Sequence, residues 1–448
     1  LETRKYETFT GRVNFQVKNV IKGLTLDVVA WRNQNYYNME NNRRSLYWYG
    51  RTTNTVRFSV NVPNSITLTK NRAYQNNLQG FLTYNFKLGQ DHNFTVLQGA
   101  SYEEYRKDEF SASAQSMITN DFFSLNFGDP LTKTNSELVQ TWALGSLFGR
   151  FNYSFKNRYL FEASYRYDGS SRLAPENRWQ LFPSFSAAWR VSQEDFMQNV
   201  SFLSDLKIRA SWGQLGNGSV LGLYDYIPLL TSGLTTSNNL VFNGVRTQYF
   251  YQNTLASPQK TWETVEQSNI GIDMAFFKNR LTVTADYYVK RNKDMLATLN
   301  VANIIGIAVS SVNIGELKSW GTELDVKWRD RVGQVDYHVG FNISDNQNKL
   351  VKYDGRNSIG SGGVVNLLEG YPLYSVWGYK TAGYFQTQQE ANDYKATVSY
   401  PFFPNPSAGD VKYLDLNKDG VISAGEGTPE KPGRSEEHTS ELQSLRHL

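Results

Sequence analysis

The sequence predicts an all-β protein: an antiparallel transmembrane β-barrel, or a fragment of one, with about twelve or more long strands in a meander. Three observations predict this class. Apolar and polar residues alternate over long segments, short turns alternate with long connections, and the composition is rich in aromatic residues. Aromatic residues make up 14% of the chain, with 28 Tyr and 26 Phe, and such residues suit the pleated surface of a sheet.

The alternation is plain in four segments, at 159–168, 281–290, 319–330 and 334–344. In the first, Tyr159, Phe161 and Tyr165 fall on one face of a strand, whereas Glu162 and Arg166 fall on the other. Strands of about ten residues are longer than the five or six that are usual in soluble sheets. The pattern therefore favours strands that cross a membrane.

Six hairpins are expected along the chain, because short connections alternate with long ones and each short connection joins the two strands of a hairpin. Their strands are predicted at 9–18 with 24–33, 74–87 with 92–106, 140–155 with 158–167, 180–192 with 205–214, 261–277 with 280–292, and 319–330 with 333–345. Five turns are very short, and the sixth (192–205) has room for a helical turn. The links between hairpins are long, at 34–73, 107–139, 168–179, 215–260, 293–318 and 346–433. This asymmetry is typical of outer-membrane barrels; the alternative is a large soluble all-β protein whose Trp and Tyr residues form its core.

The composition excludes several other classes. The chain has no Cys, and its net charge of +4 gives no support to nucleic-acid binding. No run of about 18 apolar residues is present, as a transmembrane helix would require. The mean hydropathy of −0.51 is compatible with a barrel, because only every second residue of a strand faces lipid.

The hairpins divide the chain into three parts. Residues 1–345 are expected to form transmembrane strands with short periplasmic turns and long extracellular loops, and 346–433 a long extracellular loop region. Residues 434–448 contain "RSEEHTSELQS", which matches translated sequencing-adaptor sequence, so this tail is interpreted as non-native.

Charged residues occupy the strand faces opposite the aromatic residues, and we expect them to face a water-filled lumen. These residues are Glu162, Arg166, Asp286, Lys290, Glu323, Asp325, Lys327 and Arg329. A glycosidase would need one pair of carboxylates held at a fixed separation across a cleft. The regular strand spacing favours a polar lumen instead, so we predict that the chain is not an enzyme.

Aromatic residues are also predicted in the long loops, where they would contact a substrate or a partner. They are Tyr36, Tyr37, Trp48, Tyr224, Tyr226, Tyr249 and Tyr251. Aromatic rings beside amide groups suit stacking on sugar rings, but they equally suit packing against a partner protein or other loops.

The segment "DLNKDGVISAGE" (415–426) fits a calcium-binding loop at its defined positions. Asp415, Asn417, Asp419 and Glu426 would supply side-chain oxygens, Val421 would supply its carbonyl, and a glycine follows Asp419 for the turn. The flanking prolines and glycines argue against the two helices of an EF-hand. The alternative is a turn without metal, since Asp, Asn and Gly favour turns; a structural calcium ion is thus the one cofactor that the sequence suggests, and no other is expected.

Seven sequence blocks resemble the SusC/RagA-type TonB-dependent outer-membrane transporters. They are "YRYDGSSRL" (165–173), "LFPSFSAAWRVSQEDFM" (181–197), "LKIRASWGQLGN" (206–217), "WETVEQSNIGID" (262–273), "NIGELKSWGTELDV" (313–326), "EGYPLYSVWGYKTAGYFQT" (369–387) and "GDVKYLDLNKDGVIS" (409–423). The resemblance implies a barrel of about 22 strands in the outer membrane of a Gram-negative, Bacteroidota-like cell. With about half that number, this chain is expected to be an internal fragment of the barrel and to form an open sheet.

The resemblance also implies function and partners. It implies import of glycans or oligopeptides, a SusD-like surface lipoprotein, contact with outer-membrane lipid, and energy from the TonB complex through an N-terminal plug. The plug is not recognisable in this sequence. The alternative function is an outer-membrane adhesin or calcium-binding surface protein that acts through its loops.

Overall fold

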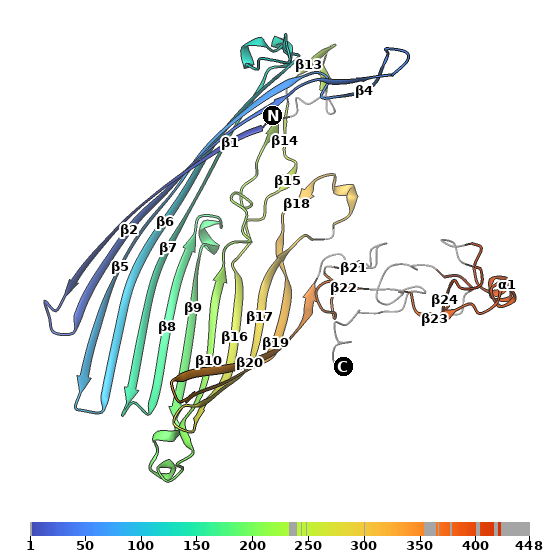
Figure 1. Cartoon of the computed structure of the whole chain (residues 1–448). Helices are drawn as coiled ribbons and strands as arrows, with labels where there is room; N and C mark the ends of the chain where they lie inside the picture. The colour runs from blue at the N-terminus through green and yellow to red at the C-terminus, as the bar shows by residue number, and fades with distance from the viewer. Residues whose placement is uncertain are drawn as a thin grey trace. The chain divides into compact units, whose positions relative to one another are not determined.

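A computed structural model describes residues 2–232, 240–242, 244–247, 249–299, 301–353, 364–365, 367–376, 379–399, 404–415 and 420–422 of the 448-residue chain. Twelve long strands form one antiparallel sheet in the order β1-β2-β5-β6-β7-β8-β9-β10-β16-β17-β19-β20 (Figure 1). The order follows the chain throughout, and β1 and β20 stand at the two ends of an unclosed sheet. The predicted fold class, an open antiparallel meander of about twelve strands, is confirmed.

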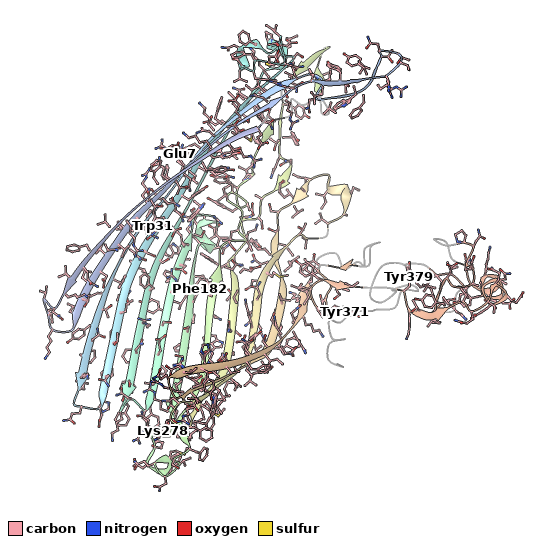
Figure 2. The ribbon with its side chains drawn as sticks, viewed as in Figure 1. Glu7, Trp31, Phe182, Lys278, Tyr371 and Tyr379 are labelled. Atoms are coloured by element: carbon pink, nitrogen blue, oxygen red, sulfur yellow. The ribbon has the colours of Figure 1, made fainter. Side chains whose placement is uncertain are left out.

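The twelve strands have these bounds: β1 Glu2–Lys18, β2 Leu24–Arg43, β5 Ser65–Leu88, β6 His92–Gln115, β7 Thr134–Phe155, β8 Tyr159–Ser170, β9 Trp179–Arg190, β10 Leu203–Asn217, β16 Glu263–Phe276, β17 Leu281–Ala297, β19 Val312–Val332 and β20 Val335–Tyr353. All six predicted hairpins are therefore present. The turn between β16 and β17 contains Lys278 (Figure 2).

Short strands pair within the connections: β3 Leu46–Tyr49 with β4 Val56–Val60, β11 Thr231–Ser232 with β14 Phe250–Tyr251, β12 Leu240–Phe242 with β13 Val245–Thr247, β15 Thr254–Leu255 with β18 Ala308–Val309, β21 Val364–Val365 with β22 Ser375–Val376, and β23 Thr381–Tyr384 with β24 Val411–Tyr413. The helices are α1 Gln388–Thr397 and the 3-10 turns Leu125–Phe127, Pro130–Thr132, Pro175–Asn177, Val191–Gln193, Asp195–Met197 and Asn303–Ile305. Two of these turns fall between β9 and β10, where the sequence left room for one. Within the described residues, no helix is long and apolar enough to cross a membrane.

Ten of the twelve strands are longer than predicted, β9 and β16 being the exceptions, and most of the long links are correspondingly shorter. β5 and β6 each contain 24 residues and remain paired from Ser65 with Gln115 to Leu88 with His92. In the halves away from the short turn, polar residues such as Lys70 and Arg72 interrupt the apolar face, so the alternation is broken there although the backbone ladder continues. The prediction of a long link over 34–73 was wrong for Tyr36 and Tyr37, which lie in β2 opposite Glu7 and Tyr6 of β1.

The chain forms two compact units. Unit 1 comprises residues 1–185 and 221–226, and unit 2 comprises 186–220 and 227–448. In unit 1, a small core of Ile66, Ala114 and Met117 closes one end of β5 and β6. In unit 2, Ala297, Leu350 and Tyr353 form a comparable core beside β17 and β20.

A helical module in unit 2 differs from the loop region expected at 346–433. β20 continues to Tyr353, and α1 carries part of a core made of Phe385, Ala391, Val398 and Ile422. The Thr387 hydroxyl caps α1 by accepting a hydrogen bond from the backbone N–H of Glu390 at 3.1 Å. This Thr-x-x-Glu pattern is a capping box, and it was the sequence signal that could have predicted the helix.

Candidate functional site: the two faces of the sheet and its loops

Each unit has an apolar face and a polar face, because paired residues of adjacent strands point to the same side of a sheet. The apolar face of unit 1 exposes large side chains such as Leu78 (55%), Tyr102 (51%) and Leu147 (47%). In unit 2, Ile270 (55%) and Phe341 (59%) do the same. A continuous exposed apolar face is costly in water and favourable against lipid.

The polar face of unit 1 carries the predicted residues Glu162 and Arg166. Glu162 lies opposite Asn152, and Arg166 lies opposite Phe148 on β7. The Arg166 guanidinium bonds both Asp168, at 3.0 Å, and the hydroxyl of Ser146, at 3.0 Å. Arg166 is therefore held within the wall by neighbours on two strands, which is a structural role.

The polar face of unit 2 contains a charge network that spans three strands. Arg209 of β10 donates to Asp273 of β16 at 3.3 Å and to Asp286 of β17 at 2.6 Å. Residue 271 lies between Arg209 and Asp286 in register, and it is a glycine. A Cβ atom there would lie 2.6 Å from the Arg209 Cζ atom and from Asp286 Oδ1. The missing side chain therefore lets Arg209 reach across β16.

The other predicted lumen residues fall on the same face. Lys290 pairs with Ser319, Glu323 with Asp286, Asp325 with Thr284, and Arg329 with His338. Lys327 and Asp325 form an exposed ion pair at 2.8 Å. The sequence analysis missed Arg209 and Asp273, although alternation in 206–217 and 262–273 would have placed them on the strand face away from Ile208 and Ile272, which pair with each other. Only the register of β10 against β16 shows that the side chains of Arg209 and Asp273 meet.

The predicted loop aromatics occupy several environments. Tyr36 and Tyr37 are strand residues, and Tyr37 lies 4.8 Å from Tyr6, centroid to centroid. Trp48 stands on β3, is 48% exposed, and contacts Phe58 of β4 at 5.3 Å between ring centroids.

The remaining aromatics come from residues 221–251. In unit 1, the Tyr224 hydroxyl accepts a hydrogen bond from the Thr141 backbone N–H at 3.1 Å, and Tyr226 is half-buried. In unit 2, the rings of Tyr249 and Tyr251 lie 5.6 Å apart. Tyr224 therefore anchors its own loop, whereas Trp48 is the more accessible ring.

The calcium-loop segment is described only in part. Asp415 Oδ2 accepts a hydrogen bond from the Gly420 backbone N–H at 2.6 Å, and Gly420 has a φ of +82°. Asn417, Asp419 and Glu426 lie outside the described residues, as does the tail 434–448. Within the described ranges, no group of three or more His, Cys, Asp or Glu residues could hold a metal ion.

The residues after the loop glycine are anchored to the α1 module. Val421 forms a parallel bridge with Ser399, and Ile422 is fully buried. Among the motif residues that the structure describes, the first and sixth positions, Asp415 and Gly420, are therefore joined by a hydrogen bond.

Long antiparallel strands with one apolar face, suited to contact with lipid, and one polar face are typical of the wall of an outer-membrane β-barrel. Residues 2–427 match the family described as TonB dependent receptor-like, beta-barrel. The chain therefore belongs to the TonB-dependent receptor β-barrel family, and the resemblance to SusC/RagA-type proteins is confirmed. This family consists of receptors and transporters and not of enzymes, in agreement with the sequence.

Named relatives support this assignment. TonB-dependent receptor P3 of Formosa agariphila is 31% identical over 356 residues, covering 77% of this chain and 34% of the relative. TonB-dependent receptor SusC of Bacteroides thetaiotaomicron is 33% identical over 224 residues, covering 47% and 21%. The solved RagAB peptide transporter superposes with a TM-score of 0.74 and 26% identity, covering 86% of this chain and 42% of that one. The chain spans less than half the length of the relatives that it matches.

Proposed function

We propose that this chain is the barrel part of a TonB-dependent outer-membrane transporter that imports glycans or oligopeptides. The observation that carries the proposal is the polar face of both units, opposite an exposed apolar face. A hydrophilic solute requires such a polar wall, and Glu162, Asp286, Lys290 and Glu323 are proposed to line the lumen. Among the relatives, RagAB is named a peptide transporter, which supports a solute of this class.

The proposed partners follow from the same relatives. A SusD-like lipoprotein would cover the extracellular opening, and the TonB complex would act through a plug in a Gram-negative, Bacteroidota-like cell. The β3–β4 hairpin is the proposed contact for the lipoprotein or the solute, because Trp48 and Phe58 are 48% and 60% exposed there. Replacing Trp48 by Ala should weaken co-purification of the lipoprotein. Replacing Tyr224 should instead change the conformation of its own loop, because this residue anchors that loop.

Growth tests distinguish the proposal from the alternative of an adhesin. The gene is deleted, and the cells are supplied with polysaccharides or oligopeptides as the sole carbon source. Loss of growth on one class, restored by the complemented gene, supports import and identifies the solute class. Unchanged growth on both classes, with reduced surface attachment, contradicts import and supports a surface protein that acts through its loops.

We also propose that the loop 415–426 binds a structural calcium ion. The positive φ of Gly420 and its hydrogen bond to Asp415 support this, as does Asp415 Oδ1, which has no hydrogen-bond partner in the described part of the chain. The buried Ile422 would couple the ion to the α1 core. Calcium should raise the melting temperature of the intact protein, and Asp415→Asn should abolish the shift; no shift in the wild type would leave only a turn.

A further inference from the structure

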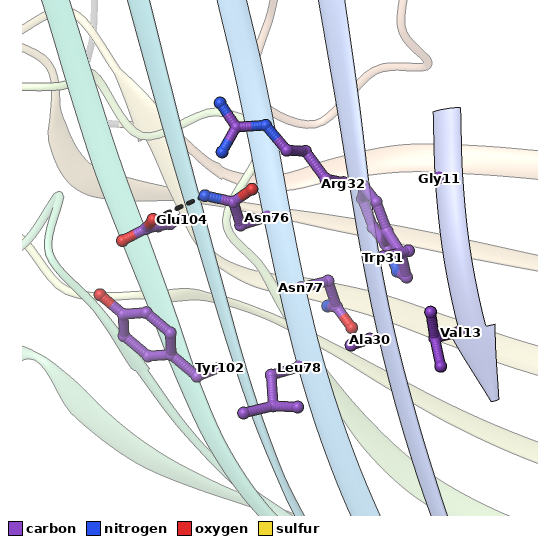
Figure 3. Close-up of a pocket in the computed structure, with 10 residues that line it drawn as sticks. All are labelled: Gly11, Val13, Ala30, Trp31, Arg32, Asn76, Asn77, Leu78, Tyr102 and Glu104. Atoms are coloured by element: carbon purple, nitrogen blue, oxygen red, sulfur yellow. Dashed lines mark hydrogen bonds between the residues drawn. The ribbon is translucent and has the colours of Figure 1, made fainter. Parts of the chain in front are cut away.

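The polar face of unit 1 carries aromatic rings and amides side by side on three adjacent strands. In one row, Trp31 of β2 pairs with Asn77 of β5, which pairs with Glu103 of β6. Figure 3 shows Trp31 on β2 and Asn77 on the neighbouring strand. In the next row of the same face, Asn33 pairs with Gln75, which pairs with Tyr105. We call these six residues the aromatic–amide patch.

The register places this patch on the same face as the predicted lumen residue Glu162. Glu162 pairs with Asn152 of β7, which pairs with Thr95 of β6. An even number of residues separates Thr95 from Tyr105 along β6, so both side chains point to the same side. About thirteen residue steps separate Tyr105 from His92 at the short turn, which is roughly 33 Å at about 3.3 Å per residue and a tilt of about 40°. The patch therefore lies on the lumen side, towards the end that bears the long loops.

Trp142 of β7 orients the ring of Tyr105. The two rings are stacked, with their centroids 5.6 Å apart and an interplanar angle of 18°. Trp142 is itself held by Arg172, whose guanidinium carbon lies 5.0 Å from the centroid of the indole and which donates to the Leu221 carbonyl at 3.3 Å. The half-buried Tyr105 is thus fixed in place, and among the described residues its hydroxyl makes no hydrogen bond.

Trp31 provides the second ring of the patch. It is half-buried, and within the described part of the chain its indole N–H makes no hydrogen bond and its ring stacks on no other ring. Trp31 and Tyr105 are separated by two strand spacings, or about 10 Å at about 4.8 Å for each spacing. One extended solute can therefore contact both rings at once.

The charged groups beside these rings are already compensated. The side-chain amides of Gln75 and Asn77 both donate to the carboxylate of Glu103, the latter at 3.1 Å. Lys107, on the same face of β6, forms an ion pair with Glu109 at 2.7 Å. The patch therefore presents aromatic rings, amides and carboxylate lone pairs to the lumen, and its charges are balanced by their own neighbours.

We propose that the aromatic–amide patch binds neutral pyranose units of an imported glycan, which rests on the import function proposed above. A pyranose has a face of C–H groups, which stacks on an aromatic ring, and a rim of hydroxyls, which donate and accept hydrogen bonds. Trp31 and Tyr105 would contact the faces of two sugar units. Asn33, Gln75 and Glu103 would bond to the hydroxyls between them.

An oligopeptide fits the patch less well, because it brings charged termini and often charged side chains. Taking such a charge out of water is costly unless a counter-charge compensates it. Glu103, Lys107 and Glu109 are already engaged with their neighbours. Of the two proposed solute classes, this patch therefore favours the glycan.

Saturation-transfer NMR titrations of the intact transporter in detergent test the proposal. The probes are maltohexaose, cellohexaose and mannohexaose, with a mixture of decapeptides as the other solute class. At least one hexasaccharide should bind, because stacking uses the C–H face that pyranoses share. Trp31→Ala and Tyr105→Ala should each raise its Kd about tenfold, whereas Trp31→Phe, which keeps a ring, should retain most of the affinity. Tyr102→Ala is the matched control, since Tyr102 lies on the same strand as Tyr105, points to the opposite face and is 51% exposed.

Three results would overturn the proposal: binding of the decapeptides alone, binding of no probe, or equal effects of Trp31→Ala and Tyr102→Ala on the Kd. The growth tests above distinguish this failure from a failure of import itself. Loss of growth on oligopeptides alone would leave import standing and refute the glycan patch. Unchanged growth on both solute classes would refute import, whatever the titrations show.

Discussion

The two units use strand glycines in different ways. In unit 1, aromatic rings lie over glycines of the apolar face: a Cβ at Gly169 would sit 2.4 Å from the indole of Trp179, and one at Gly149 would sit 2.5 Å from the Tyr165 ring. In unit 2, the guanidinium of Arg209 crosses Gly271 on the polar face. Glycine within a strand marks close approach of a neighbour in both cases, but one approach packs a ring and the other joins charges.

This comparison predicts that the interaction of Arg209 with Asp286 across Gly271 contributes more to stability than the packing of Trp179 over Gly169. Arg209→Met would leave Asp286 without its cation, and the free energy of unfolding should fall by about 3 kcal/mol, discounted for the partial exposure of the pair. Urea unfolding in detergent micelles measures the change. Lys207→Met is the control, because Arg209 still neutralises Asp273 in that variant. An equal loss of unfolding free energy in both variants would contradict a special contribution from the Arg209–Asp286 interaction.

Gly271→Ala should have the next largest effect. The new methyl group would displace the Arg209 guanidinium, so part of the charge-assisted bonding would be lost, at a cost of about 2 kcal/mol. Gly340→Ala is the matched control on β20, because its nearest neighbour, the Cγ atom of Lys327, lies at an ordinary 3.7 Å. If both variants unfold at the same urea concentration, the space at Gly271 is not required.

Gly169→Ala should cost less, about 1 kcal/mol, because the half-exposed Trp179 ring can turn away from the methyl group. Loss of the stacking of Trp179 on Tyr167, now 5.2 Å between centroids, should shift the tryptophan fluorescence. Gly80→Ala on β5 provides the control in the same unit, since its neighbours lie at 3.9 Å. If Gly169→Ala lowered the free energy of unfolding more than Gly271→Ala, the aromatic packing in unit 1 would contribute more to stability than the charge network in unit 2.

The smallest expected effect is the pH dependence of the α1 module. The Gln386 backbone N–H and the Lys412 ammonium hold the pKa of Glu390 below its ordinary value. Since the folded pKa is the lower one, Glu390 stabilises the module above the pKa of the unfolded chain. That contribution disappears as the pH falls through the folded pKa. The protection factors for hydrogen exchange in the first turn of α1, which are corrected for the slower intrinsic exchange in acid, should fall as the pH falls. Glu390→Gln should remove this dependence; an unchanged dependence would assign it to another group.

Sequence patterns were informative wherever one face of a strand was apolar. Alternation in β8, β17, β19 and β20 predicted both the strands and the faces, because the side-chain period of a strand is two. It could not predict the polar outer half of β2, so Tyr36 and Tyr37 were assigned to a loop. The α1 helix was missed because its capping box lies in a segment without apolar periodicity.

The sequence by itself determined the class of the protein: long alternating strands, short turns, long links and the blocks that resemble SusC/RagA-type transporters. Only the tertiary structure decided which side chains meet. Arg209 and Asp286 are 77 residues apart in sequence, and Trp31 and Tyr105 share one face of unit 1 only through the register of three strands. Register depends on every pair along a ladder, and a shift of one residue would turn each of these side chains to the opposite face.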